Sequence, residues 1–196
     1  MNRLRSLSLL ALALLSLPGC VFTPLGTART LASGETRHQA GLGLANLDGF
    51  LWPSWSYEYR HGLADGAEVG VGFRDFGPTV DVKLALLRTD DVALAVEPTL
   101  TAWPDFSGTF LNLPLLFDLD VASWATLTLA TSPMVGVPDT DFRYLGTGAG
   151  VALWVTDGFA VQPSVQWLTP LGREPDLDDG YGFAGLGFLF GPPPVR

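Results

Sequence analysis

The sequence predicts an all-β fold, an antiparallel up-and-down meander that closes into a β-barrel after an N-terminal signal segment. Apolar and polar residues alternate with a period of two in about ten segments, the pattern of strands with two unlike faces. Turn-forming clusters separate the segments, and almost nothing repeats at helical spacing. We therefore expect about ten strands, with eight as the alternative count.

The connections between the expected strands fall into two groups. Asp65-Gly66, Asp90-Asp91 and Asp157-Gly158 mark short turns, whereas several of the other connections are longer and rich in Pro and Asp. Short turns at one end and longer loops at the other are typical of outer-membrane barrels. An even strand number then puts both ends of the barrel on the periplasmic side. The expected strands cover residues 35–47, 50–60, 67–76, 79–88, 91–103, 108–119, 125–136, 142–156, 159–169 and 180–190.

The two faces of the strands differ in a way that favours a membrane barrel. In the ninth strand Val161, Val165 and Trp167 alternate with Gln162, Ser164 and Gln166, and elsewhere the second face is mostly Gly, Ala or Thr. A small, polar face with few charges suits a narrow lumen better than it suits bulk water. We expect the aliphatic face to point outward into lipid. Aromatic residues would form two interfacial girdles, with Trp52, Trp55, Trp103 and Trp167 at one and Tyr59, Trp124 and Trp154 at the other.

One feature of the sequence does not fit a closed membrane barrel. Pro98 and Pro114 fall in the middle of expected strands, where each removes a hydrogen-bond donor from the ladder. They leave open a soluble β-barrel or sandwich.

The net charge of -9 and the scattered Lys and Arg residues argue against nucleic acid as a partner.

The only cysteine, Cys20, follows a basic start and a short apolar run in the order Leu17-Pro18-Gly19-Cys20. This segment resembles the lipobox of bacterial lipoproteins. The resemblance implies a signal peptide at 1–19, cleavage before Cys20 and diacylglycerol on its sulfur, and Val21 resembles the residue that follows in lipoproteins sent to the outer membrane. The alternative is a buried free thiol. The remaining chain divides into a lipidated tether at 20–34, a barrel at 35–190 and a tail at 191–196.

Charged residues gather on the face that we assign to the lumen. Placing the hairpins on their turns sets Arg60 opposite Glu68, and likewise Arg74 opposite Asp81 and Lys83 opposite Glu97. A network of mixed sign can satisfy buried charges that a dry core could not hold. We expect it to fill a narrow lumen; a selective pore is the alternative. The predicted network comprises Arg37, Glu58, Arg60, Glu68, Arg74, Asp81, Lys83 and Glu97.

The sequence shows no constellation of residues for catalysis. His38 and His61 are the only imidazoles, and neither lies near a nucleophile and an orienting acid. A weak candidate calcium loop comprises Glu174, Asp176, Asp178 and Asp179, although it lacks the ligand order of a known calcium loop. Gly146 to Gly150 lacks the Lys-Ser/Thr of a phosphate loop and suits close strand packing. We predict no enzyme, no metal, and no cofactor beyond the lipid.

The sequence as a whole predicts an outer-membrane β-barrel lipoprotein, similar to small barrels of Gram-negative bacteria, with a structural or surface-interaction role. Its expected partners are membrane lipid and the machineries that process lipoproteins and assemble barrels. One alternative is a lipid-anchored soluble β-barrel or sandwich in the periplasm that binds an apolar ligand. The other is a narrow selective pore. The expected location is the outer membrane, with the N-terminus on the periplasmic side.

Overall fold

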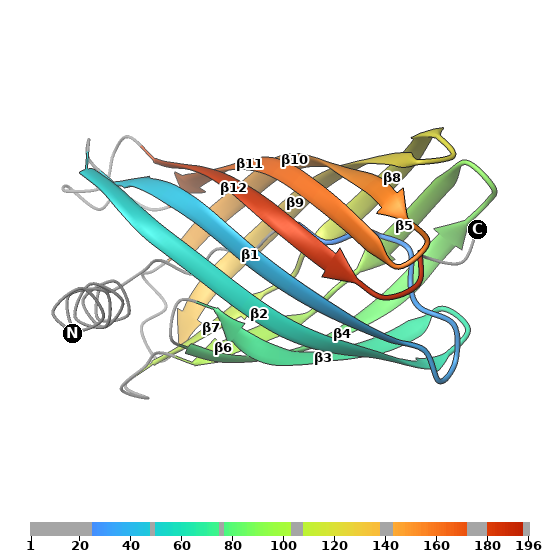
Figure 1. The fold of residues 1–196 in the computed structure, drawn as a ribbon. Helices are drawn as coiled ribbons and strands as arrows, with labels where there is room; N and C mark the ends of the chain where they lie inside the picture. Colours follow the sequence, from blue (N-terminus) through green and yellow to red (C-terminus); the bar gives the residue numbers. More distant parts are fainter. Residues whose placement is uncertain are drawn as a thin grey trace, which may run out of the picture.

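The protein folds as one closed antiparallel barrel, seen in a computed structural model that describes residues 25–47, 50–74, 77–102, 108–137, 143–171 and 180–193 (Figure 1). Each β segment pairs with its neighbours in one sheet, and pairing of β9 with β10 closes it. None of the described residues forms a helix long and apolar enough to cross a membrane. The segments are β1 (Thr36–Leu47), β2 (Phe50–Ala64), β3 (Ala67–Arg74), β4 (Gly77–Arg88), β5 (Val92–Val96), β6 (Thr99–Ala102), β7 (Thr109–Asn112), β8 (Leu115–Ala122), β9 (Ala125–Val137), β10 (Arg143–Thr156), β11 (Phe159–Pro170) and β12 (Tyr181–Phe190).

The twelve segments make ten continuous strands, because two strands are each interrupted at a proline. Pro98 separates β5 from β6, and Pro114 separates β7 from β8. The register with the neighbouring strands is unchanged across both interruptions. Each proline still accepts a ladder bond through its carbonyl oxygen: Val82 N donates to Pro98 O at 3.1 Å, and Glu97 N donates to Pro114 O at 2.9 Å. The predicted class and the count of ten strands are confirmed, and the central prolines interrupt the ladder without breaking the barrel.

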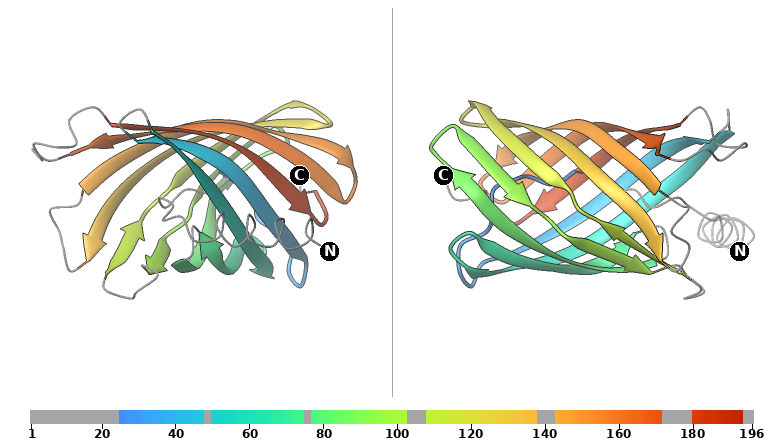
Figure 2. Two further views of the ribbon diagram at one scale, coloured as in Figure 1. Left: turned by 60° about the vertical axis from the view of Figure 1, so that its left-hand side comes forward. Right: turned by 180° about the vertical axis from the view of Figure 1, so that it is seen from behind.

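The two ends of the barrel differ, as the sequence predicts. At one end, which we call the short-turn end, two- or three-residue turns join β2 to β3, β4 to β5, β8 to β9 and β10 to β11. β1 starts and β12 ends there. The other end carries the connections from β6 to β7, β9 to β10 and β11 to β12, which are longer, and we call it the long-loop end. Figure 2 shows from two further sides that the strands run between these ends at a common tilt.

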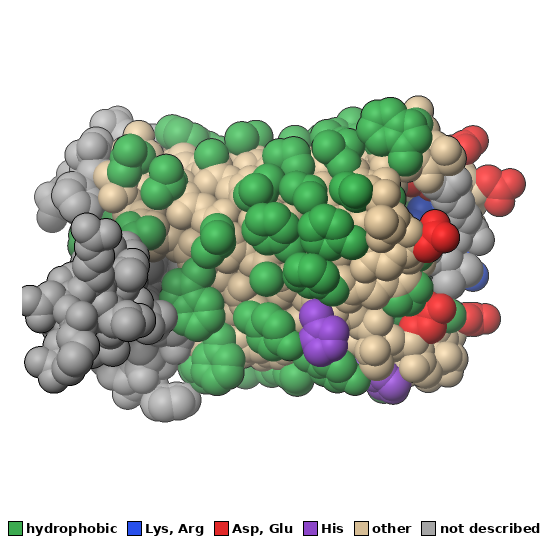
Figure 3. All heavy atoms as spheres, viewed as in Figure 1, with side chains coloured by type: hydrophobic (Ala, Val, Ile, Leu, Met, Phe, Trp, Pro, Cys, Tyr) green, Lys and Arg blue, Asp and Glu red, His purple; other side chains and the backbone are tan. Residues whose placement is uncertain are grey.

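The faces of the barrel are arranged oppositely to those of a soluble protein. Large apolar side chains cover the outside: Leu42 is 63% exposed, Val165 59% and Phe73 51%. Figure 3 shows this apolar surface around the middle of the barrel, with carboxylates gathered beyond it at one end. The residues that alternate with these side chains point inward, and many are polar or charged, such as Glu68, Thr128 and Gln162. The predicted assignment of the two faces is therefore confirmed.

Most of the described residues before β1 lie inside the barrel. Residues 25–34, which we call the lumen segment, run from the middle of the lumen to the short-turn end, where the chain turns into β1 (Figure 1). Thr27, Ala28, Arg29, Thr30 and Leu31 are at most 1% exposed. Residues 20–34 are predicted from the sequence only as a tether, but residues 25–34 occupy the short-turn half of the lumen.

The lumen is apolar toward the long-loop end. A cluster of inward-facing residues, which we call the mouth cluster, packs there, and Trp52 contacts it from β2. At the opposite end Trp154 packs inward against Ala152, Ala160 and Leu189. The prediction that Trp52 and Trp154 belong to lipid-facing girdles is therefore wrong, because their places in the strand alternation turn them into the lumen. The mouth cluster consists of Ala45, Phe110, Met134, Tyr144, Leu168 and Phe183.

Candidate functional site in the barrel lumen

An ion-pair network in the lumen is centred on Arg60 of β2. Its guanidinium lies 2.6 Å (Nε) from Glu68 Oε1 and 2.5 Å (Nη2) from Asp81 Oδ1. It also lies 3.0 Å (Nη1) from Glu58 Oε2 and 3.3 Å (Nη2) from Glu97 Oε2. One arginine therefore faces four carboxylates from β2 to β5, and its side chain is only 3% exposed.

Two further cations form ion pairs with these carboxylates. Arg74 Nε lies 2.6 Å from Glu58 Oε1, and Arg74 Nη2 lies 3.9 Å from Glu97 Oε1. Lys83 Nζ lies 3.1 Å from both Glu68 Oε1 and Glu97 Oε2. Buried charges are tolerated only where partners replace the lost water. Here Glu58, Glu68 and Glu97 each meet two cations, and Asp81 meets Arg60. The structure thus joins seven of the eight predicted residues in one network, which we call the charge network: Glu58, Arg60, Glu68, Arg74, Asp81, Lys83 and Glu97.

Of the three pairs predicted within this network, only one has the predicted register. Lys83 and Glu97 lie opposite each other in the β4–β5 register, as predicted. Arg60 faces Gly70 instead of Glu68, because the β2–β3 turn lies at residues 65–66 and not around position 64, the midpoint of the predicted pair. The Arg60–Glu68 ion pair forms diagonally. The pairing of Arg74 with Asp81 is wrong.

The tight β3–β4 connection explains the Arg74 error. Arg74 pairs with Gly77, so that the centre of the hairpin lies before Gly77 rather than at Gly77-Pro78. Asp81 instead faces Gly70, and Arg74 reaches Glu58 on the neighbouring strand.

Arg37, the eighth predicted residue, lies outside the network. It pairs in register with Arg60, yet its guanidinium turns toward the short-turn end. There Arg37 Nη2 donates to the carbonyl oxygen of Pro192 at 2.8 Å, and the guanidinium carbon lies 5.6 Å from the centre of the Trp154 ring. Arg37 thus holds the chain after β12 against the barrel end.

Two glycines of β3 make room for the network. A side chain at Gly70 would overlap the carboxylate of Asp81, and one at Gly72 would overlap the backbone at Tyr57 and Glu58. The inward face of β3 is thus kept small where the long side chains of its neighbours converge. This close approach explains the small residues that alternate with Val69 and Val71 in the sequence.

A second polar cluster, which the sequence analysis missed, joins the lumen segment to β8. Arg29 Nη2 lies 2.9 Å from Asp120 Oδ2, and Arg29 N donates to Asp118 Oδ2 at 3.2 Å. The guanidinium also donates to the carbonyl oxygens of Thr89 at 3.1 Å and Asp90 at 2.8 Å. The alternation of Asp118 and Asp120 with Phe117 and Leu119 carried the signal for two inward carboxylates, but the cation that meets them lay in the assumed tether.

Uncharged polar side chains also line part of the lumen wall. Thr128 Oγ1 donates to Asp118 Oδ1 at 2.7 Å, and Gln162 Nε2 donates to the carbonyl oxygen of Gly26 at 2.5 Å. A β-carbon at Gly148 would lie 3.1 Å from Leu25 Cδ2. The glycines of β10 therefore leave space for the lumen segment, consistent with the close packing expected for this stretch.

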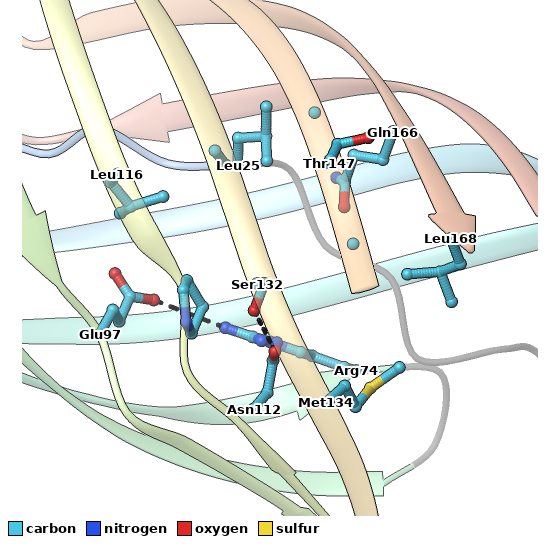
Figure 4. Close-up of a pocket in the computed structure, with 14 residues that line it drawn as sticks. Leu25, Arg74, Glu97, Asn112, Leu116, Ser132, Met134, Thr147, Gln166 and Leu168 are labelled. Carbon is cyan, nitrogen blue, oxygen red and sulfur yellow. Dashed lines mark hydrogen bonds and ion pairs between the residues drawn. The ribbon is translucent and has the colours of Figure 1, made fainter. Parts of the chain in front are cut away.

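A small cavity of about 70 Å³ remains beside Leu25. Arg74 and Glu97 line one side, and Asn112 and Ser132, which share a hydrogen bond, line another (Figure 4). Met134 also lines this cavity and belongs to the mouth cluster, so the cavity lies on the long-loop side of Leu25.

The described residues hold no group of three or more His, Cys, Asp or Glu side chains placed to bind a metal ion. His38 lies on the outer surface, where its Nδ1 is 2.7 Å from the hydroxyl of Tyr57. The candidate calcium loop, Glu174 to Asp179, lies outside the described residues, as does Cys20.

The closed barrel, with its apolar outer surface and charged lumen, has the fold of outer-membrane β-barrels. Three solved structures of this kind are similar over nearly their whole length. The NanC porin has 9% identity and a TM-score of 0.53, covering 78% of this chain and 98% of that chain. The KdgM porin in complex with disordered oligogalacturonate has 8% identity and a TM-score of 0.52, covering 79% and 98%.

An outer-membrane channel from Pseudomonas putida F1 is the third, with 11% identity and a TM-score of 0.55, covering 87% of this chain and all of that chain. No protein-family model matches the chain, and no curated protein matches its sequence. At these identities the likeness shows the fold alone.

Proposed function

We propose that the protein is an integral outer-membrane β-barrel lipoprotein whose lumen is closed by its own side chains and by the lumen segment. Its role is structural or directed to partners at the membrane surface. The single observation that carries this proposal is that the lumen is occupied. The charge network lies on one wall, and Arg29 of the lumen segment forms an ion pair with the opposite wall. The lipid on Cys20 rests on the lipobox resemblance.

The distribution of polarity supports insertion into a membrane. A soluble barrel that binds an apolar ligand needs an apolar interior and a polar exterior, whereas here Glu68 is fully buried and Leu42 is exposed. The differing ends support an orientation with the short turns in the periplasm. β1 then starts and β12 ends on the periplasmic side.

The same contacts support a closed lumen over a narrow pore. Barrels of about eight strands leave an interior that side chains fill, and ten strands widen it only slightly. In this protein the lumen segment occupies that added space. We also propose that the protein is not an enzyme and that its partners are membrane lipid and the lipoprotein-processing and barrel-assembly machineries.

The test of membrane integration replaces residues 1–20 with a cleavable signal sequence that carries no lipobox. An integral barrel stays in the membrane fraction after alkaline extraction and migrates differently on a gel when it is not heated. Release of the variant as a soluble periplasmic protein would support the lipid-anchored soluble alternative instead.

The test of closure is conductance in planar bilayers. The mature protein is expected to show no stable large channel, and reproducible openings of nanosiemens size would contradict the closed lumen. An unrelated open porin reconstituted in the same way serves as the positive control.

A further inference from the structure

A groove lies on the outer surface of the barrel near its long-loop end. Its volume is about 300 Å³, compared with about 70 Å³ for the cavity beside Leu25 in the lumen. Sites for small ligands begin at about this size. The groove is therefore large enough to hold part of a ligand. Its outward-facing lining residues are Leu111, Leu113, Pro133, Val135, Arg143 and Leu171.

The alternation of side chains along the strands explains the shape of the groove. β9 lies between β7 and β10, and Val135 of β9 pairs with Leu111 on one side and with Arg143 on the other. Met134, next to Val135, points into the lumen, so Val135 and its two partners point outward (Figure 4). The short valine therefore forms a floor between two longer side chains. It is partly covered, whereas the outward-facing Val165 is exposed.

The walls of the groove are mainly apolar. Leu111 and Leu113 form one wall. Leu171 lies beside Arg143 on the other, where Leu171 N donates to Arg143 O at 2.9 Å. Adjacent strands lie about 4.8 Å apart, so the backbones of β7 and β10 are separated by about 10 Å. Side chains on both walls narrow this gap, and the space that remains suits a hydrocarbon chain rather than a globular ligand.

Arg143 places a positive charge at the groove. It begins β10 at the long-loop end, and in the described part of the chain it and Arg88 are the only exposed Lys or Arg residues. An arginine at the edge of an apolar surface extends its guanidinium to the level of the lipid headgroups. Arg143 also interacts with other groups of the chain, but a guanidinium has five N–H donors and can bind a phosphate at the same time.

We propose that this groove binds one lipid with a phosphate headgroup, whose acyl chain lies over Pro133 and Val135 and whose phosphate contacts Arg143. The inference rests on the proposed function in one respect, that the outer surface of the barrel faces lipid. It deepens that function by naming the class of lipid and its site. It depends on neither the lipobox, nor the closed lumen, nor the end of the barrel that faces outward.

Native mass spectrometry of the protein extracted from membranes in detergent tests the groove. The probes are dioleoylphosphatidic acid and dioleoylglycerol, which has the same acyl chains and no phosphate. The protein is expected to bind one phosphatidic acid, and to bind dioleoylglycerol about tenfold more weakly because a bond to a charged group is lost. Val135→Trp fills the groove and should lower the affinity for both lipids about tenfold or more. Val165→Trp, on the outward face of β11, is the control and should change neither affinity.

Arg143→Gln tests the contact with the phosphate. It should weaken the binding of phosphatidic acid about tenfold and leave that of dioleoylglycerol unchanged. Arg88→Gln, at an exposed position near the short-turn end, should change neither. If Val135→Trp binds phosphatidic acid as the wild type does, the groove is not the site. If Arg143→Gln does so, the phosphate contact is wrong, and if the wild type binds neither lipid, both are wrong.

Failure of the proposed function gives a different result from failure of this inference. Release of the lipobox-free variant by alkaline extraction contradicts the integral barrel itself. A Val135→Trp variant that stays in the membrane fraction, migrates as the wild type does without heating, and binds phosphatidic acid with unchanged affinity contradicts only the lipid site.

Discussion

The two walls of the lumen solve the problem of buried polarity differently. The wall of β2 to β5, with Glu97 directly after β5, carries four carboxylates and three cations that form ion pairs across neighbouring strands. The wall of β8 to β11 carries Asp118, Asp120, Thr128 and Gln162, and no cation of its own faces these carboxylates among the described residues. The lumen segment supplies the missing partners. Arg29 forms an ion pair with Asp120, and the carbonyl oxygen of Gly26 accepts a hydrogen bond from Gln162.

The difference shows that the two walls depend on different parts of the chain. The charge network is complete within consecutive hairpins, so its cohesion comes from residues less than 40 positions apart. The opposite wall is completed only when the lumen segment is in place, through contacts such as the one between Gly26 and Gln162. The first wall is therefore sensitive to loss of its own side chains, and the second to displacement of the lumen segment.

The largest expected effect is that of Arg60→Ala in the charge network. The change leaves four carboxylates around a buried gap, and breaking a buried ion pair by removing one partner costs about 3 to 5 kcal/mol. Unfolding by denaturant in detergent or lipid should show this loss, and Arg88→Ala, at an exposed position of β4, should show almost none. Equal stability of the two variants would mean that the first wall does not depend on its central cation.

Arg29→Ala tests the dependence of the second wall on the lumen segment. It removes the ion pair with Asp120 and two bonds to carbonyl oxygens, and we expect a net loss of about 1.5 to 3 kcal/mol, the contribution of one hydrogen bond to a charged group. We expect a smaller loss of stability than for Arg60→Ala, because Asp120 lies near the barrel end where water can replace the guanidinium. Millimolar methylguanidinium should restore part of the loss in thermal unfolding, and Arg88→Ala should not respond to it.

Gly148→Val tests the packing of the segment against β10. The added side chain meets Leu25 and Gln166, and overpacking of this kind costs about 1 to 3 kcal/mol. Ala149→Val, on the outward face of the same strand, is the control and should leave stability unchanged. If Gly148→Val also speeds protease cleavage near residue 25, the lumen segment has been displaced. Unchanged cleavage would mean that the barrel wall, and not the segment, has moved to make room for the added side chain.

The sequence predicts the first wall better than the second, for a physical reason. Strand alternation places Arg60, Glu68 and Lys83 on one face, and turn positions bring their strands together, so local patterns suffice. The errors arose where the centre of a hairpin was misplaced, at the β2–β3 turn of residues 65–66 and at the tight connection after Arg74. These shifts depend on the position of a turn to within one or two residues, which the alternation of polar and apolar residues does not reveal.

The second wall could not be predicted because its partner carries no periodic pattern. The lumen segment has no strand alternation, and its short polar residues resemble any linker. Only the closed barrel shows that Arg29 meets Asp120, 91 positions away. The inward carboxylates of β8 were visible as an alternation, and an unpaired acidic face in a narrow lumen is itself a sign that a distant cation is needed.

The smallest effect is expected for Gln162→Leu, which tests a single contact between the second wall and the lumen segment. The change removes the bond from Gln162 Nε2 to Gly26 O, and a neutral hydrogen bond contributes about 1 kcal/mol. Val165→Ala, on the lipid-facing side of β11, is the control. Combined with Arg29→Ala, the effect of Gln162→Leu should shrink, because a segment already released at Arg29 no longer holds Gly26 against β11. Strict additivity of the two changes in a double-mutant cycle would show instead that β8 and β11 hold the segment independently.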